Sequence, residues 1–228
     1  MIYFLPYLYY YREESNMLNH SAAHLGLKLR VWFIISISCF VALALMTNIY
    51  AAEKKTFIWN FDEENDDIVQ EATGSGNDGK FNDPGIQWNE GKVNKGLTFA
   101  GSNTHPHWID VPHSPDMDIQ NAITLEAWVF PKEISPGRPT IIQKKSSYYL
   151  RLDLTSQVTI QLYGVEPSDH QFSHGQVKLN EWTHIAVTYD GTEIKFYING
   201  EQDENVVRAA GKIQSTTNPV HFAGDWSG

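Results

Sequence analysis

Apolar and polar residues alternate with a period of two along most of the chain after residue 53, and this pattern predicts β-strands and not helices. The clearest case is 123–130, where apolar residues occupy every second position. Pro131 follows, and it has no backbone N–H with which to extend a strand. Further strands are expected at 56–61, 96–99, 108–111, 148–154 and 158–163.

Short turn signals join the best-defined of these strands. Residues 182–189 and 193–198 flank Asp190-Gly191, and Asn199-Gly200 follows the second strand. Asp-Gly and Asn-Gly supply the positive φ angles that hairpin turns require. A tight turn at 155–157 predicts a second hairpin. Many short strands separated by closely spaced turns predict an all-β, two-sheet antiparallel sandwich.

The first fifty-two residues differ from the rest of the chain. Residues 31–46 carry no charge, follow two basic residues and precede Ala51-Ala52, which is the order of a secretory signal peptide. The apolar run is shorter than the ~20 residues that a membrane-spanning helix needs. We therefore expect 1–52 to be a cleaved leader, with an uncleaved signal anchor as the alternative. Either interpretation places residues 53–228 on the extracytoplasmic side of the membrane.

The Tyr-rich stretch 1–16 gives no usable signal of its own. Met17 stands at a normal distance before the apolar run, so translation from Met17 would omit that stretch.

The charge balance becomes more acidic once the leader is set aside. The whole chain has 17 Lys+Arg and 27 Asp+Glu, a net charge of -10. Residues 1–52 hold three of the basic and two of the acidic residues, so 14 and 25 remain, a net charge of -11. Nucleic-acid binding needs clustered basic residues, so we expect no nucleic-acid partner. Cys39, the one cysteine, lies in the leader, which leaves the rest free of thiols and disulfides.

The hairpin formed by 181–191 and 195–200 resembles the hallmark hairpin of concanavalin A-like, laminin-G-like jelly-roll domains. The companion segments follow the order of that family: 61–63, 76–79, 96–101, 109–112, 123–129, 141–144 and 220–224. The resemblance covers about residues 56–226. It implies one jelly-roll domain over 53–228.

The resemblance also implies that the domain is C-terminally incomplete. In the family a final strand follows the segment that ends at Gly224 and returns beside the first strand, whereas this sequence stops at Gly228. We therefore expect a fragment whose sheet edge at 57–59 is unpaired. An unpaired edge is an aggregation hazard.

Patterns for catalysis are weak. Glycan hydrolases place two carboxylates across the scissile bond, about 5–5.5 Å or 6.5–9.5 Å apart. Glu126 stands alone on its predicted strand, while Asp116 and Asp118 follow Pro115 in a predicted loop. The sequence has no Gly-x-Ser-x-Gly motif of a serine hydrolase. We expect a non-catalytic protein, with a glycan hydrolase as the alternative.

A structural calcium ion is the one cofactor that the sequence suggests. Asp62, Glu63, Asn77 and Asp78 surround a Gly-rich loop and offer the oxygen ligands that calcium prefers. Laminin-G-like relatives often hold calcium at the edge of the sandwich. The alternative is a solvated acidic loop without a metal.

Carbohydrate binding is the other function that the resemblance implies. Sugars are recognised by aromatic faces together with amide and carboxylate side chains. The candidate contacts are Trp108, Tyr163, His170, Gln171, Phe172 and Trp226.

These observations predict an exported binding module for carbohydrate or for an extracellular protein. It would be secreted or displayed at the cell surface, and it would meet a membrane only through an uncleaved N-terminal segment. A purely structural or adhesion module of a larger cell-surface protein is the alternative.

Overall fold

The computed structural model describes residues 2–9, 55–63, 67–100, 105–134 and 140–224. For 2–9 it describes the backbone only. The described residues are nearly all in strands and loops, with one short 3-10 helix, η1 (Pro115–Met117). The predicted all-β class is confirmed.

Two large antiparallel sheets make up the fold. Sheet A has the strand order β16-β15-β14-β8-β1-β6-β5, with β2 also paired to β1. Its strands are β1 (Ile2–Tyr9), β2 (Thr56–Ile58), β5 (Gln87–Glu90), β6 (Lys95–Phe99), β8 (Ile123–Val129), β14 (Thr183–Tyr189), β15 (Glu193–Ile198) and β16 (Glu201–Arg208).

Sheet B has the order β13-β11-β10-β9-β18-β7-β4-β3. Its strands are β3 (Ile68–Val69), β4 (Gly79–Phe81), β7 (Ile109–Val111), β9 (Thr140–Lys144), β10 (Tyr148–Leu152), β11 (Gln157–Leu162), β13 (Gln171–Gln176) and β18 (Val220–Phe222). A small third sheet pairs β12 (Val165–Glu166) with β17 (Ala210–Gly211).

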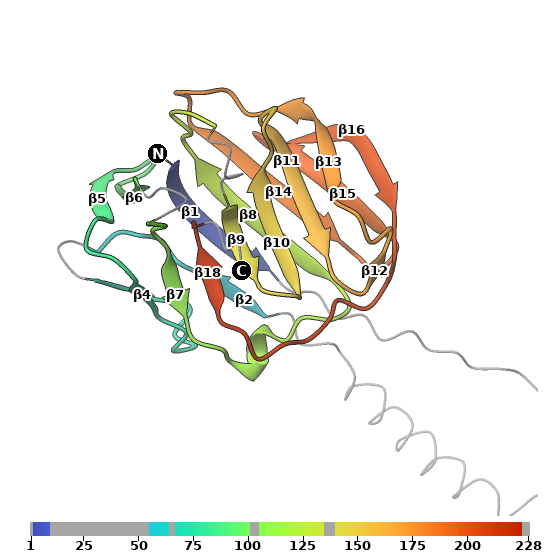
Figure 1. The fold of residues 1–228 in the computed structure, drawn as a ribbon, viewed down its shortest axis with the longest axis horizontal. Helices are drawn as coiled ribbons and strands as arrows, with labels where there is room; N and C mark the ends of the chain where they lie inside the picture. The colour runs from blue at the N-terminus through green and yellow to red at the C-terminus, as the bar shows by residue number, and fades with distance from the viewer. Residues whose placement is uncertain (1, 10–54, 64–66, 101–104, 135–139, 225–228) are drawn as a thin grey trace, which may run out of the picture. The chain divides into compact units, whose positions relative to one another are not determined.

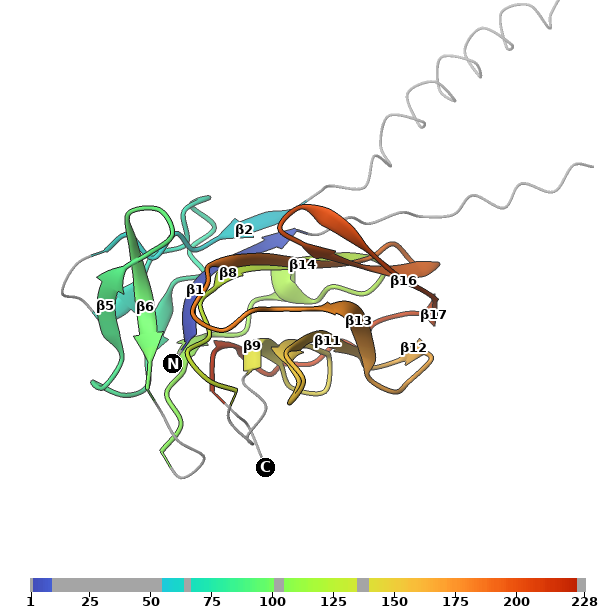
Figure 2. The ribbon, with the colours of Figure 1, turned by 90° about the horizontal axis from the view of Figure 1, so that it is seen from above.

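The two sheets form the layers of a sandwich, as Figure 2 shows with β8 and β14 in one layer and β9 and β11 in the other. Strand β8 alternates strictly between buried and half-buried positions, as its sequence predicts. Its buried residues join one continuous apolar core with Trp59, Leu150, Phe196 and Phe222, all of which are buried. The jelly-roll sandwich is thereby confirmed.

Both predicted hairpins are present. Strands β14 and β15 pair around Gly191, whose φ is +95°, and β15 continues into β16 through Asn199 and Gly200, both with positive φ. Strands β10 and β11 pair around a turn in which Ser156 has a φ of +67°. Local turn chemistry therefore sets these registers.

The N-terminal strand β1 was not predicted, and it corrects one expectation. Residues 2–9 form a strand between β8 and β6 in sheet A (Figure 1). The edge at 57–59, expected to be unpaired, is paired where Tyr7 to Tyr9 of β1 lie opposite Ile58 to Thr56 of β2. Strand β1 could not be recognised from local sequence because its partner strands are far away along the chain.

The apolar run 31–46 lies outside the described residues, so the signal or anchor stays a prediction. In the part of the chain that the structure describes, no helix is long and apolar enough to cross a membrane.

Candidate functional site

The outer face of sheet B carries a row of side chains in cross-strand register. Asp110 of β7 lies opposite His221 of β18, which lies opposite Gln143 of β9. Gln143 in turn lies opposite Tyr149 of β10, and Tyr149 opposite Gln161 of β11. Because side chains alternate along a strand, these five point away from the core that their neighbours fill. We call Asp110, His221, Gln143, Tyr149 and Gln161 the outer row.

An indole lies at one end of the outer row. The Trp108 ring is 5.6 Å from the His221 ring, centroid to centroid. Asn82 makes two hydrogen bonds with the backbone of Trp108. Its side-chain oxygen accepts the Trp108 backbone N–H at 2.6 Å, and its backbone N–H donates to the Trp108 carbonyl at 3.0 Å. Gly224 lies so close that a Cβ there would be 3.1 Å from the Trp108 Cβ. The backbone thus fixes where this ring sits.

His221 supports Trp108 as a buried and largely uncharged ring. Its side chain packs under the indole, with 6% of the residue exposed. Burial lowers the pKa of His221, although the Asp110 carboxylate, 3.2 Å from Nε2, opposes this. At neutral pH this end of the row therefore presents aromatic surface with little positive charge.

A second aromatic group lies toward the other end. The Tyr149 ring, 8% exposed as a residue, is 5.6 Å from the His170 ring, and His170 is 6.3 Å from Phe172. The guanidinium carbon of Arg151 lies 4.6 Å from the centre of the Tyr149 ring. Phe172 is 38% exposed, so an apolar ring is open to solvent here.

Strand β16 of sheet A fixes the edge strand β13 that carries Phe172. The Asp203 carboxylate accepts the backbone N–H of His174 at 2.9 Å and of Gly175 at 2.7 Å. The Asn205 side-chain amide donates to the Phe172 carbonyl at 2.6 Å. Burial alone would raise the pKa of Asp203, but its backbone N–H donors lower it. A charged aspartate therefore clamps the strand that presents Phe172.

Gln143 lies between the two aromatic groups. Its side-chain amide is half-buried and has no hydrogen-bond partner within the described ranges. Tyr149 and His221 sit two strands apart, which is about 10 Å at the usual strand spacing. An elongated polar ligand could thus contact an aromatic group at each end and the amide in the middle.

The sequence-predicted contacts divide into three groups. Trp108, His170 and Phe172 belong to this face, and the structure links them through the unpredicted His221, Tyr149 and Gln143. The Gln171 amide donates to the Asp169 carbonyl at 2.8 Å, and Tyr163, 36% exposed, lies just past the end of β11. Trp226 lies outside the described residues. Alternation along 148–154 could have placed Tyr149 on the outer face, because Leu150 and Leu152 face the core.

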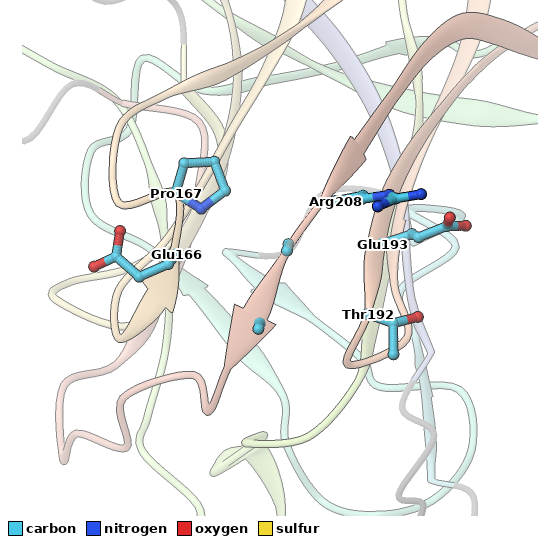
Figure 3. A pocket seen from close by; sticks show the side chains of 7 residues that line it. Glu166, Pro167, Thr192, Glu193 and Arg208 are labelled. Atoms are coloured by element: carbon cyan, nitrogen blue, oxygen red, sulfur yellow. The ribbon is translucent and has the colours of Figure 1, made fainter.

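A shallow pocket of about 590 Å³ lies elsewhere, beside the small third sheet. Glu166 and Pro167 line one side, and Thr192, Glu193 and Arg208 line the other, as Figure 3 shows. Arg208 makes no ion pair within the described part of the chain. The pocket offers charged groups but no aromatic ring, which makes it the weaker candidate for sugar stacking.

The acidic loop predicted to bind calcium is held by hydrogen bonds. Asp78 accepts the Glu71 N–H at 2.8 Å, Glu63 accepts the Gln70 N–H at 2.9 Å, and Asn77 donates to the Ser75 hydroxyl. Among the described residues, no three His, Cys, Asp or Glu side chains gather as they would around a metal ion. The Asp62, Glu63, Asn77 and Asp78 site stays a prediction. A bound calcium ion would raise the unfolding temperature by mass action. A thermal melt that neither calcium nor a chelator changes would reject the predicted site.

The one carboxylate singled out on a predicted strand lies on the outer face of sheet A. The Glu126 Oε2 is 3.7 Å from the His184 Nε2, and the His184 ring is 5.3 Å from the Trp128 ring. Burial raises the pKa of Glu126 and lowers that of His184. This pair joins one carboxylate to one imidazole, which is not the two-carboxylate arrangement of glycan hydrolases.

Comparison with known proteins gives one family match and two solved structures of limited similarity. A laminin G family model, described as the concanavalin A-like lectin/glucanases superfamily, matches residues 103–228, more than half of the chain. Domain 4 of AbnA, a GH43 extracellular arabinanase from Geobacillus stearothermophilus in complex with arabinotriose, is 19% identical, with a TM-score of 0.48 over 68% of this chain and 76% of that chain. The carbohydrate-binding module CBM66 from Bacillus subtilis is 12% identical, with a TM-score of 0.32 over 63% of this chain and 91% of that chain. No curated protein matches the chain.

Proposed function

Because the chain belongs to the concanavalin A-like lectin/glucanases superfamily, we propose that it is a non-catalytic module that binds a neutral carbohydrate on the outer face of sheet B. The observation that carries this proposal is the pair of aromatic groups, Trp108 with His221 and Tyr149 with His170 and Phe172, on either side of Gln143. Aromatic faces pack on the C–H surfaces of sugar rings, while amides bond their hydroxyls.

The charges on this face favour a neutral ligand over a polyanion. Asp110 and Arg151 both border the aromatic groups, and burial keeps His221 largely neutral. The whole chain is also acidic, at -10. A strongly anionic glycan would be repelled at long range.

The proposal includes export, so that the module meets its ligand outside the cell. The uncharged run 31–46 behind two basic residues supports this. Mass measurement of the protein recovered from the culture medium of its source tests it, since a cleaved leader would leave a chain that begins near residue 53.

Affinity electrophoresis through gels that contain neutral polysaccharides tests the binding site. We expect Phe172→Ala and Trp108→Ala each to weaken retention at least about tenfold, which corresponds to about 1.4 kcal/mol. Val206→Ala is the matched control, since Val206 is as exposed as Phe172, at 38%, but belongs to β16 of sheet A. Arg208→Ala reports on the pocket.

The outcomes separate the alternatives. Retention without release of reducing ends supports a binding module, whereas release of reducing ends would show a glycan hydrolase. If Arg208→Ala loses retention and Phe172→Ala keeps it, the carbohydrate site lies in the pocket and not on the outer face of sheet B. No retention on any neutral polysaccharide would reject the carbohydrate proposal and leave a protein-binding or structural module.

A further inference from the structure

Sheet A is continuous only through its N-terminal strand. Within the described residues, β8 pairs with β14 on one side and β1 on the other, β6 pairs with β5 and β1, and β2 pairs with β1 alone. Strand β1 therefore fills a gap one strand wide, with β8 along one border and β6 and β2 along the other (Figure 1).

The register of β1 satisfies both borders at once. Phe4 to Tyr9 lie opposite Val129 to Thr124 of β8. On the other border, Ile2 to Phe4 lie opposite Phe99 to Leu97 of β6, and Tyr7 to Tyr9 lie opposite Ile58 to Thr56 of β2. All three pairings are antiparallel, so any occupant of the gap must run in one direction and in one register.

An empty gap would leave backbone N–H and C=O groups of three strands without partners. Such exposed edges capture other strands, and filling them in trans is a common route to exchange between copies. Strand β1 is joined to β2 by residues 10–55, a long connection. The local concentration of a tethered segment falls as its tether lengthens and is about millimolar even for short tethers. A long tether therefore gives the cis strand a limited advantage over a strand from another molecule.

We propose that the gap in sheet A is an acceptor site for one extended strand, which residues 2–9 of a second copy of this chain fill in trans by exchange with the chain's own β1. The exchanged dimer keeps every backbone pairing of the closed monomer and has two equivalent filled sites. This proposal does not depend on carbohydrate binding. It concerns the chain that keeps residues 2–9, and not a chain from which the leader 1–52 has been cleaved.

Disulfide trapping in the full chain tests the exchange. In a Cys39→Ser background, which removes the one native thiol, a tagged chain carries Tyr9→Cys and an untagged chain carries Thr124→Cys. The two are mixed at about millimolar concentration, warmed briefly, cooled and oxidised. We expect a disulfide-linked tagged–untagged dimer, because Tyr9 of β1 lies opposite Thr124 in the acceptor site.

Thr188→Cys is the matched control partner for Tyr9→Cys. Thr188 of β14 lies opposite Thr124 on the side away from β1, so it is two strand spacings, about 9.6 Å, from β1. Disulfides need Cα atoms within about 7 Å. We expect at least about tenfold less linked dimer with this partner. Equal trapping by both partners would mean collision and would overturn the proposal.

The double variant Tyr9→Cys/Thr124→Cys, oxidised at micromolar concentration, reports on the site in cis. A cis disulfide without the mixed dimer would overturn the exchange, and the absence of both would overturn the acceptor site itself. The neighbouring pair Tyr7→Cys and Glu126→Cys, with Ala186→Cys as its control, repeats the test where near-ultraviolet circular dichroism shows that the first pair disturbs folding.

Discussion

The Glu71 carboxylate accepts a 2.8 Å hydrogen bond from the backbone N–H of Ile58, and this contact ties the acidic loop to β2. The same carboxylate accepts the backbone N–H and the hydroxyl of both Thr73 and Ser75, at 2.7–3.0 Å. Glu71 is 5% exposed. One buried anion therefore closes the turn at 71–75 and fixes it to the sandwich.

Replacing this anion with an amide should destabilise the fold. In Glu71→Gln, an NH2 group would face donors that now meet an oxygen. We expect a loss of about 2–3 kcal/mol, since hydrogen bonds to a charged group contribute about 1.5–3 kcal/mol. Urea unfolding monitored by tryptophan fluorescence measures it. An unchanged midpoint would show that the loop does not depend on the charge.

The same group predicts a loss of stability in acid. Burial alone would raise the pKa of Glu71, but its hydrogen-bond donors lower it below the ordinary 4.5. A carboxyl whose pKa is lower in the folded state contributes stability above its unfolded value and loses it as the pH falls. We expect the difference between wild type and Glu71→Gln to be full at pH 6–7 and to shrink below about pH 4.5. A difference that is constant down to pH 3 would contradict this.

Glu126 should behave in the opposite way. Burial raises its pKa, so the folded state increasingly disfavours the charged form as the pH rises past 4.5. We expect Glu126→Gln to stabilise the protein at pH 7 and to have little effect at pH 4, because the amide carries no charge that burial would penalise. Thermal melts at the two pH values test this. Destabilisation at pH 7 would show that the contact with His184 outweighs burial.

Ser156 adopts a backbone conformation that glycine prefers. Its φ of +67° is costly for a residue with a Cβ. We expect Ser156→Gly to raise stability by about 0.5–1 kcal/mol. Asn199→Gly is the contrasting variant: Asn199 also has a positive φ, but its side-chain oxygen accepts the His184 N–H at 3.0 Å, and glycine would lose that bond. Equal gains for both variants would show that the side-chain bond contributes nothing.

Asp203 should influence ligand binding without touching the ligand. Asp203→Ala removes the acceptor for the backbone N–H groups of His174 and Gly175. We expect the free energy of unfolding to fall by about 1–3 kcal/mol. We also expect retention on a neutral polysaccharide to weaken, because the strand that presents Phe172 loses these hydrogen bonds. Hydrogen exchange at His174 and Gly175 should rise in parallel. Weaker retention with unchanged exchange would assign Asp203 a direct role.

Local signals made most of the fold predictable. Asp190-Gly191 and Asn199-Gly200 set the β14–β15–β16 hairpins through turn geometry that depends on neighbouring residues. The strict alternation of 123–129 likewise fixed which side of β8 enters the core. In both cases the sequence pattern and the structural cause lie within a few residues of each other.

Strand β1 and the outer row could not be predicted from the sequence. Both depend on the order of strands in the sheets, which short sequence patterns do not contain. Residues 2–9 read as a continuous aromatic and apolar stretch at the start of the leader, and their partners near 97 and 127 are distant in sequence. Trp108 and Phe172 were recognisable as aromatics on short segments. Their supporting rings, His221 and Tyr149, reach the same face only because β18, β9 and β10 are neighbours.

The pairing of Tyr9 with Thr56 also limits the topology of the chain at a membrane. The uncharged run 31–46 lies between these two residues in sequence. Two strands cannot share hydrogen bonds from opposite sides of a bilayer, so a chain whose run 31–46 crosses a membrane cannot also hold β1 in sheet A. Membrane insertion and the complete sheet are therefore mutually exclusive states of one polypeptide, and translocation of the sandwich would leave residues 2–9 behind.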